Sequence, residues 1–233
     1  PEEVAACWLS AADDLASLGT AHVRSLFLSV RESAEMPPAK TTPVRRLQWL
    51  CGRLAVKNAM LDALRRRGEG RHLPHPVEIT VFNEANGAPA VTLAASADAW
   101  HPPLAVSLAH SGHAAAAAVG PGPVGIDLEP LLRTPHFEPG QIATPVEMKL
   151  AETGSVEGAA PLLQLWVAKE AAAKAARVGL TVGAANWRLT AVQPDRSWII
   201  ADAAGGRRQT VRFAVHRDWL LALARSQSRC TAT

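Results

Sequence analysis

A short apolar segment carries two carboxylates at a spacing that a β-strand turns into a pair. Residues 124–129 read VGIDLE, so on a strand Asp127 and Glu129 point to the same face. Ile126 and Leu128 then point the other way, into a core. Two carboxylates on one face of a strand can contribute to a site for a hard divalent cation.

A second segment places charges along one stripe of a helix. Residues 166–174 read WVAKEAAAK, in which Lys169, Glu170 and Lys174 follow Trp166 at helical spacing. If this helix meets the strand, Glu170 joins the two strand carboxylates with Lys174 beside them. Three carboxylates and a lysine make a site for a divalent cation on a phosphate-bearing substrate.

Each motif also has an ordinary explanation. Acidic residues on strands are usually solvated, and an alanine-rich helix often carries a pair like Glu170 and Lys174. Two details favour a functional interpretation. Gly125 and Pro130 bracket the Asp-x-Glu tightly, and Trp166 lies one turn ahead of Glu170 on the same face of the helix.

Together the motifs resemble the signature of the 4′-phosphopantetheinyl transferases of the surfactin-synthetase (Sfp) type. That family has a Gly-[Ile/Val]-Asp-[Ile/Leu/Val]-Glu strand followed by a Trp/Phe-x-x-Lys-Glu-[Ala/Ser]-x-x-Lys helix, and both stand here without a gap. Weaker similarities are an apolar strand that runs into His-Ser, a helix with a Gly-Arg pair and a loop after the Lys-Glu helix. They occupy residues 106–112, 49–57 and 179–181, and the resemblance runs from about residue 45 to about residue 225.

The resemblance implies an activity and its cofactors. Members of the family transfer 4′-phosphopantetheine from coenzyme A to a serine of an acyl or peptidyl carrier protein and release 3′,5′-ADP. Mg²⁺ prefers octahedral oxygen coordination, which suits two or three carboxylates together with diphosphate oxygens. We therefore assign Asp127, Glu129 and Glu170 to the metal. Lys174, one helical turn past Glu170, is assigned to the leaving phosphate.

The resemblance also suggests residues for the remaining tasks. It puts a Thr/Pro-x-x-Glu segment just before the Lys-Glu helix, so Glu147 is predicted as the general base, with a metal-bound water as the competing candidate. The ordinary explanation of Glu147 is a first-turn helix acid after Pro145. His110, at a strand end before Ser-Gly, is predicted to present its ring to the 3′-phosphate. The other predicted contacts to coenzyme A are the basic residues Arg45, Arg46, Arg53, Lys57 and Lys169.

Three positions depart from the family pattern. The family commonly has a lysine, a serine and a basic residue where this chain has Ala88, Ala109 and Gln48. Each lost contact is of a kind worth roughly 1.5–3 kcal/mol when charged. We therefore expect catalysis to be intact, and the affinity for coenzyme A to be weaker than in relatives that keep these groups.

Composition limits the class of protein. The chain has 233 residues, of which 48% are hydrophobic and 19% charged, as is typical of a globular protein. Its three cysteines form no Cys-x-x-Cys pair and indicate neither a zinc site nor a disulfide framework. A reducing cytoplasm is therefore the expected location. No apolar run reaches the ~18 residues of a membrane span, so we expect no membrane partner, and no patch of interleaved basic and aromatic residues indicates a nucleic-acid partner. The net charge of +3 would suit a polyanionic cofactor or an acidic protein partner.

The expected elements favour an α+β fold. The alanine run at 114–119 is interpreted as a strand, because Gly112 and the prolines that follow leave no room for a helix. The resemblance implies two similar halves about a pseudo-twofold axis, each a long helix against an antiparallel sheet, with the cofactor in the cleft between them. We place the approximate boundary between 1–115 and 116–233, with the metal and catalytic motifs in the second half. Helices are predicted over 44–67, 145–152 and 161–177, and strands over 77–83, 90–93, 104–110, 114–119, 186–193, 197–201, 209–216 and 219–224.

Other functions stay open on these observations. A metal-dependent nuclease would also use clustered carboxylates and a lysine, although Glu170 and Lys174 lie four apart and not as the usual Glu-x-Lys. The three lost contacts are compatible with a weak carrier-binding module, and a purely structural domain would leave the converging charges unexplained. The segment around 45–53 most resembles transferase domains fused to the C-terminus of large polyketide synthases. The carrier is therefore expected either as a separate protein or in the same polypeptide.

Overall fold

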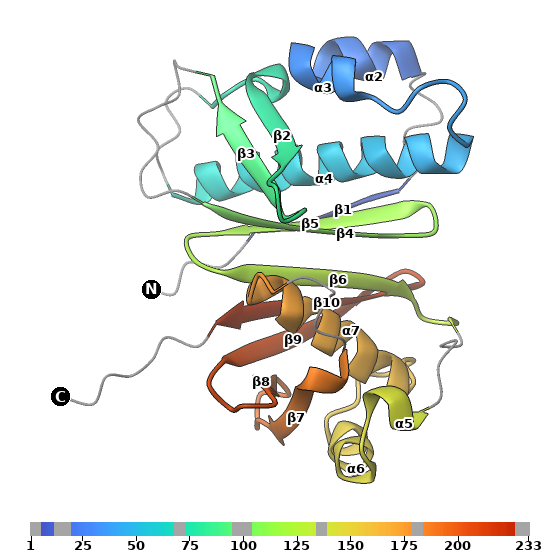
Figure 1. The fold of residues 1–233 in the computed structure, drawn as a ribbon, viewed down its shortest axis with the longest axis vertical. Helices are drawn as coiled ribbons and strands as arrows, with labels where there is room; N and C mark the ends of the chain where they lie inside the picture. The colour runs from blue at the N-terminus through green and yellow to red at the C-terminus, as the bar shows by residue number, and fades with distance from the viewer. Residues whose placement is uncertain are drawn as a thin grey trace, which may run out of the picture. The chain divides into compact units, whose positions relative to one another are not determined.

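The computed structural model describes residues 6–11, 20–67, 73–94, 104–133, 139–178 and 184–226 (Figure 1). The chain divides into two compact units, residues 1–121 and 122–233. The division falls after β5 (Ala114–Gly120), because that strand pairs within the first unit along both of its edges. The predicted boundary, which was approximate, lies inside this strand.

The first unit packs one long helix against a three-stranded antiparallel sheet. The helix α4 (Pro43–Arg66) has proline in its first turn and arginines in its last, and it contacts all three strands. β5 is the central strand and is completely buried, so the alanine run is a strand as predicted. The remaining elements are β1 (Ala6–Ala11), α2 (Thr20–Phe27), α3 (Val30–Glu35), the 3₁₀ turn η1 (Pro76–Glu78), β2 (Ile79–Asn83), β3 (Pro89–Leu93) and β4 (Ala105–Ser111).

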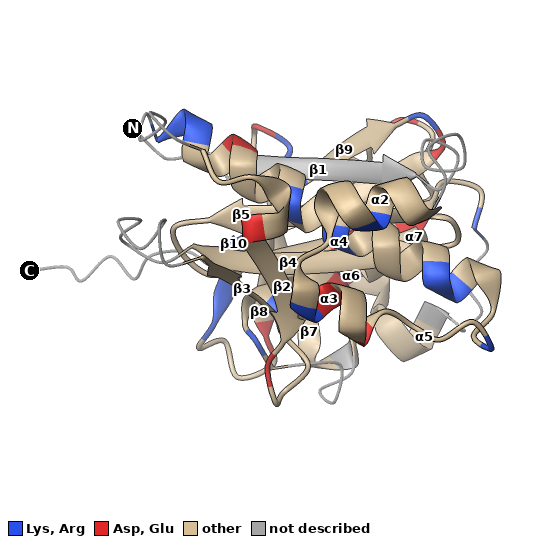
Figure 2. Cartoon of the chain, turned by 90° about the horizontal axis from the view of Figure 1, so that it is seen from above, with Lys and Arg blue, Asp and Glu red and all other residues tan. Residues whose placement is uncertain are grey.

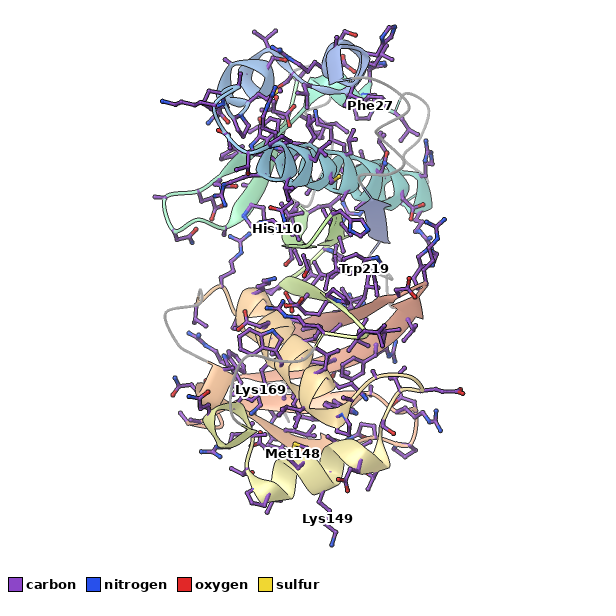
Figure 3. All side chains as sticks on the ribbon, turned by 90° about the vertical axis from the view of Figure 1, so that its right-hand side faces the viewer. Phe27, His110, Met148, Lys149, Lys169 and Trp219 are labelled. Atoms are coloured by element: carbon purple, nitrogen blue, oxygen red, sulfur yellow. The ribbon has the colours of Figure 1, made fainter. Side chains whose placement is uncertain are left out.

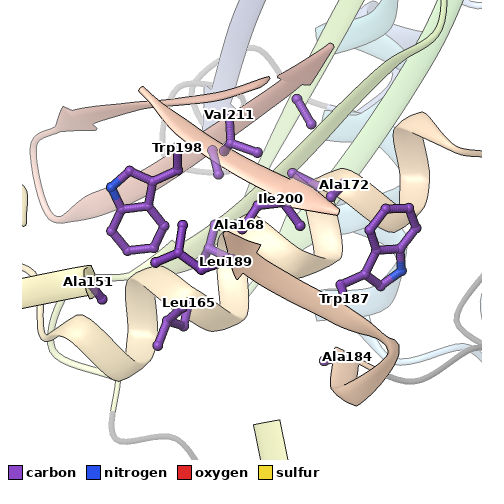
Figure 4. Packing of buried hydrophobic residues seen from close by; sticks show 14 of the residues in the cluster. Ala151, Leu165, Ala168, Ala172, Ala184, Trp187, Leu189, Trp198, Ile200 and Val211 are labelled. Carbon is purple, nitrogen blue, oxygen red and sulfur yellow. The ribbon is translucent and has the colours of Figure 1, made fainter. Parts of the chain in front are cut away.

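The second unit packs a long helix across a five-stranded antiparallel sheet in the order β6-β10-β9-β8-β7. The helix α7 (Pro161–Ala175) lies on β6 and β10. Figure 4 shows the core of this unit, which includes Trp187 and Trp198 of the sheet and Leu165 of the helix. The other elements are β6 (Val124–Pro130), α5 (Pro139–Ile142), α6 (Pro145–Thr153), η3 (Ala184–Asn186), β7 (Trp187–Val192), β8 (Trp198–Asp202), β9 (Arg208–His216) and β10 (Trp219–Ser226).

The two units repeat one order of elements. β1-α2-α3-α4-η1-β2-β3-β4-β5 corresponds in sequence order to β6-α5-α6-α7-η3-β7-β8-β9-β10. Even the turns agree: Gly87 between β2 and β3 has φ 84°, and Arg196 at the same place between β7 and β8 has φ 63°. In each turn the preceding side chain, Asn86 or Asp195, accepts a backbone N–H from two residues further on. The predicted α+β class, with a long helix against an antiparallel sheet in each half, is confirmed.

The predicted helices and strands are present with ends that move by one or two residues. The exception is 77–83, where the 3₁₀ turn η1 precedes a shorter strand β2. Nothing was predicted for the first forty residues, which contain β1, α2 and α3. Within the described ranges, no helix combines the length and apolar character that crossing a membrane requires.

Candidate functional site

The strand β6 and the helix α7 touch at backbone level. A Cβ atom on Gly125 of β6 would lie 2.0 Å from the carbonyl oxygen of Ala171 and 2.5 Å from the nitrogen of Ala175. Only glycine leaves room for the helix at this point. The close approach brings the carboxylates of the strand near Glu170 and Lys174 of the helix.

The carboxylates of Asp127, Glu129 and Glu170 form a buried acidic cluster. Their residues are only 8%, 7% and 7% exposed, respectively. Nζ of Lys174 donates a hydrogen bond to Oδ1 of Asp127 at 2.6 Å. Arg133, just after β6, makes an ion pair with Glu129. Sequence reasoning missed Arg133, although its place four residues after Glu129 was a visible signal.

The ionised forms of the cluster repel one another. Burial and the charge of Asp127 raise the pKa of Glu170 to about 7; Glu129 acts in the same direction, and Lys174 opposes them. Burial also raises the pKa of Asp127, against the attraction of Lys174. A site that gathers carboxylates in spite of such repulsion favours the binding of a cation.

The donor set fits a hard divalent cation in its chemistry. Carboxylate oxygens are the ligands that Mg²⁺ and Ca²⁺ prefer, and the cluster supplies three such side chains from two packed elements. Lys174 and Arg133 now neutralise Asp127 and Glu129. Within the described part of the chain, however, no three His, Cys, Asp or Glu side chains, those of the cluster included, are arranged so that they could hold a metal ion. The metal assignment therefore stays a prediction that rests on the chemistry of the donors.

The raised pKa of Glu170 predicts a stability that depends on pH. The pKa is about 7 in the folded chain against 4.5 in the free side chain, so the contribution is fully present below pH 4.5 and is lost as pH rises through 7. In the metal-free protein we expect the free energy of unfolding to fall by on the order of 2 kcal/mol between pH 5 and pH 8 through this group. Urea unfolding in a chelator at the two pH values measures the change.

The control for this prediction is a pair of neutral variants. Glu170→Gln should remove most of the decrease, whereas Glu152→Gln, at an exposed position of α6, should keep it. If Mg²⁺ binds the ionised cluster, its addition at pH 8 should raise the stability of the wild type and leave Glu170→Gln nearly unchanged. An unaltered pH dependence in Glu170→Gln would contradict the assignment of the decrease to this carboxylate.

The carboxylate of Glu147, the predicted general base, already accepts several hydrogen bonds and pairs with a lysine. It is the third residue of α6, where its carboxylate accepts the backbone N–H of Thr144 at 2.8 Å and the N–H of Leu189 at 3.0 Å. Nζ of Lys169 lies 2.7 Å from Oε1. Burial alone would raise the pKa of Glu147, but these donors lower it from its usual value. A proton acceptor works best with a pKa near the operating pH, and this environment opposes that.

Two of the predicted contacts to coenzyme A are buried lysines. Lys169 and Lys57 are each 1% exposed, and burial lowers the pKa of both. Nζ of Lys57 lies 2.6 Å from Glu32 and also donates to two backbone carbonyls. Lys169 pairs with Glu147 in the same manner. The structure argues against a role in cofactor binding for both lysines, because their amino groups are already bonded inside one unit.

The predicted arginines of α4 differ in accessibility. Arg45 is exposed and Arg46 half-buried, while Arg53 is 7% exposed and lies over the ring of Trp49, at 4.5 Å from its centroid. Among the described residues, the buried Nε atoms of Arg46 and Arg53 have no hydrogen-bond partner. His110 is exposed near the end of β4, where Figure 3 shows its place. Nε of Arg53 also lies 4.0 Å from Oε1 of Glu32, so Arg45, Arg46 and His110 are the side chains that the structure leaves most available to a phosphate.

The three departures from the family pattern have local explanations. Gln48 donates from Nε2 to the carbonyl oxygen of Gly112 at 2.6 Å and so supports the turn between β4 and β5. Ala109 is 4% exposed and belongs to the buried side of β4. Ala88 lies in the turn between β2 and β3, where its N–H donates to the side chain of Asn86.

The second unit matches a known protein family. Residues 123–224, which include the whole acidic cluster and Lys174, match the model of the 4′-phosphopantetheinyl transferase superfamily. This part of the chain is therefore similar to the superfamily that the two motifs predicted. The Sfp subtype stays a prediction. No curated protein matches the chain.

Solved structures with a similar fold are holo-acyl-carrier-protein synthases. The enzyme of Helicobacter pylori, solved in complex with coenzyme A, is 21% identical and aligns over 50% of this chain and 97% of its own, with a TM-score of 0.39. For the Plasmodium yoelii enzyme the identity is 13%, the coverage 51% and 93%, and the TM-score 0.42. For the Neisseria meningitidis enzyme these values are 20%, 51% and 97%, and 0.41.

Proposed function

We propose that the protein transfers 4′-phosphopantetheine from coenzyme A to a serine of a carrier protein. One observation carries the proposal: the acidic cluster and Lys174 come together on β6 and α7 of a domain that matches the transferase superfamily. In this reaction the serine oxygen bonds to a phosphorus of the diphosphate and the phosphorus–oxygen bond to 3′,5′-ADP breaks. The serine proton passes to a base, and the released phosphate takes up the negative charge.

In this proposal some residues of the site bind the metal and another neutralises the leaving phosphate. Asp127, Glu129 and Glu170 would hold Mg²⁺, which when bound neutralises the diphosphate oxygens and aligns them for in-line attack. The amino group of Lys174 lies beside Asp127 and faces the position of the leaving phosphate in this proposal. A positive group fixed there stabilises the charge that develops as the bond breaks. The burial of the cluster strengthens each of these interactions.

The arginines of α4 are proposed as the binding groups for the rest of coenzyme A. The buried Nε donors of Arg46 and Arg53 have no hydrogen-bond partner among the described residues, although Nε of Arg53 lies 4.0 Å from Glu32, and a phosphate would satisfy them. Arg45 and His110 are exposed and complete the proposed set. Uniform binding of this kind lowers the KM for coenzyme A and leaves kcat unchanged.

A labelling experiment tests the function. The protein is incubated with a fluorescent coenzyme A, Mg²⁺ and an apo acyl carrier protein, and label on the carrier is followed with time. We expect labelling that needs Mg²⁺ and the carrier serine, and that a serine-to-alanine carrier abolishes. Absence of labelling with acyl and peptidyl carriers alike would contradict the proposal. Cleavage of DNA under these conditions would favour the alternative of a metal-dependent nuclease.

The carrier is expected to contact α6. Carrier proteins are acidic helical bundles, so basic and apolar residues should face them. Figure 3 shows Lys149 pointing away from the unit, and Val146 is 71% exposed on the same helix. Met148 and Leu150, which flank Lys149 on this helix, are half-buried against the core of the unit. The surface of α6 that is open to a carrier therefore centres on Val146 and Lys149.

The substitution Lys149→Glu tests this surface. We expect the KM for an acidic carrier to rise about threefold to tenfold at low ionic strength and the increase to shrink in salt, because exposed charges are screened. The KM for coenzyme A should not change. Lys149→Gln, which removes the charge without reversing it, should give an intermediate value. Equal carrier KM values for Lys149→Glu and the wild type at low salt would place the carrier elsewhere.

A further inference from the structure

The pair of Glu147 and Lys169 belongs to a larger clamp within the second unit. Glu147 is the third residue of α6 and makes a capping box with Thr144. Its carboxylate also accepts the N–H of Leu189 in β7. Lys169 of α7 pairs with this carboxylate and donates to the carbonyl oxygen of Ile142, the last residue of α5. Three helices and a strand thus meet at one buried ion pair.

The first unit contains the same clamp. Glu32 is the third residue of α3 and makes a capping box with Ser29. Its carboxylate accepts the N–H of Val81 in β2 at 3.1 Å. Lys57 of α4 pairs with it at 2.6 Å and donates to the carbonyl oxygen of Phe27, the last residue of α2. Figure 2 shows basic and acidic residues on α3, the helix whose sequence contains Glu32.

The correspondence holds residue by residue. The lysine reaches the carbonyl oxygen two residues before the capping residue in both units, at Phe27 and at Ile142. The strand N–H comes in each case from the third residue of the strand after the 3₁₀ turn, Val81 or Leu189. Such a match in elements, partners and register indicates that both clamps serve one structural purpose.

The first unit has the clamp but lacks the acidic cluster. Asn58 follows Lys57 where Glu170 follows Lys169. On the strands, the register of β1 with β5 and of β6 with β10 places Trp8 and Ser10 where the second unit has its two cluster carboxylates. The clamp of the first unit is therefore present without carboxylates at the positions equivalent to Asp127, Glu129 and Glu170. Its role in the second unit need not be chemical either.

We propose that Glu147 and Lys169 are positioning residues, the second copy of a clamp whose first copy is Glu32 and Lys57. The clamp ties the long helix to the short helices before it and to the strand after it. In the second unit this fixes α7, so that Glu170, the neighbour of Lys169, reaches the acidic cluster. The carrier serine then gives its proton to a group other than Glu147. This last step rests on the proposed function, whereas the equivalence of the clamps does not.

Four variants test the inference. Glu147→Gln and Glu32→Gln each leave a buried lysine without its counter-charge, and Glu147→Gln/Lys169→Met and Glu32→Gln/Lys57→Met remove both charges of the pair. Arg188, 3.9 Å from Glu147, is half exposed, whereas Arg53, 4.0 Å from Glu32, is buried and keeps its charge in every variant. We expect the urea midpoint to fall in both single variants and to recover in both double variants, less completely in the first unit because Arg53 stays unpaired there. In the second unit the rate of transfer should follow stability. The kcat of Glu147→Gln/Lys169→Met should be at least about tenfold higher than that of Glu147→Gln, and its pH profile should resemble that of the wild type.

The outcomes that overturn the inference are distinct. If Glu147 is the general base, its loss should reduce kcat by about 10²–10⁴-fold both in Glu147→Gln and in Glu147→Gln/Lys169→Met, while circular dichroism shows both variants to be folded. A fall of the urea midpoint in Glu32→Gln but not in Glu147→Gln would show that the clamps are not equivalent. If the wild type transfers nothing, the proposed function fails, and the unfolding measurements still decide whether the two units share the clamp.

Discussion

Replacing Asp127 by alanine is expected to reduce kcat by about 10³-fold or more, because the diphosphate then meets uncompensated charge during transfer. Glu170→Ala should have an effect of the same size. Glu129→Ala should cost less, since water can fill one position of an octahedral metal site. The measurement is kcat at saturating coenzyme A and Mg²⁺. Turnover of Asp127→Ala close to that of the wild type would contradict the assignment of the cluster to the metal.

A second readout separates metal binding from general damage to the site. Asp127 also holds Lys174 at 2.6 Å, so its loss frees the lysine and changes the charge of the site in two ways. Titration with Mg²⁺ should raise the melting temperature of the wild type and have little effect on Asp127→Ala. Glu152→Ala removes an exposed carboxylate from α6 and is the matched control. It should respond to Mg²⁺ as the wild type does.

The acidic cluster could be predicted from the sequence because two local periods define it. A strand places Asp127 and Glu129 on one face, and a helix places Glu170 and Lys174 on one stripe. The only long-range step was that strand and helix meet, and Gly125 supplied the reason once the structure showed the close approach. The contact between the two motifs thus depends on a residue that carries no chemistry of its own.

The clamps could not be predicted in full, because their bonds join residues that are far apart in the chain. The Ser-x-x-Glu and Thr-x-x-Glu patterns of the two capping boxes were visible in the sequence. The partner of each acid was not: Glu32 and Lys57 are 25 positions apart, and Glu147 and Leu189 are 42 apart. Nothing in the local pattern distinguishes Lys57 from a surface lysine. What distinguishes Lys57 is its burial, and burial follows from the whole fold.

The structural repeat of the two units could not be recognised by comparing their amino-acid sequences. It lies in the order of elements, the turns and the hydrogen-bond partners, whereas the side chains at equivalent positions differ in kind, as Asn58 and Glu170 do. The first forty residues yielded no predicted element, because β1, α2 and α3 are each short. The alanine run was predicted correctly because its boundaries, Gly112 and Pro121, excluded a helix.

The substitution Gly125→Ala should be among the most damaging single changes in the chain. The new methyl group would lie 2.0 Å from the carbonyl oxygen of Ala171, an atom of the helix backbone that cannot rotate away. α7 must shift from β6, which separates Glu170 from the strand carboxylates. We expect the free energy of unfolding to fall by about 3 kcal/mol, at the upper end for an overpacked core, and transfer to be lost. Urea unfolding and the labelling assay measure the two effects.

Gly52→Ala in α4 is the matched control for this prediction. A Cβ there would approach Cδ2 of Leu108 at 3.2 Å, and that flexible side chain can move by a few tenths of an ångström. Alanine also favours a helix interior over glycine by up to about 1 kcal/mol, so Gly52→Ala should be close to neutral or stabilising. If Gly125→Ala proves as stable as Gly52→Ala, the backbone contact between β6 and α7 does not determine how the acidic cluster is assembled.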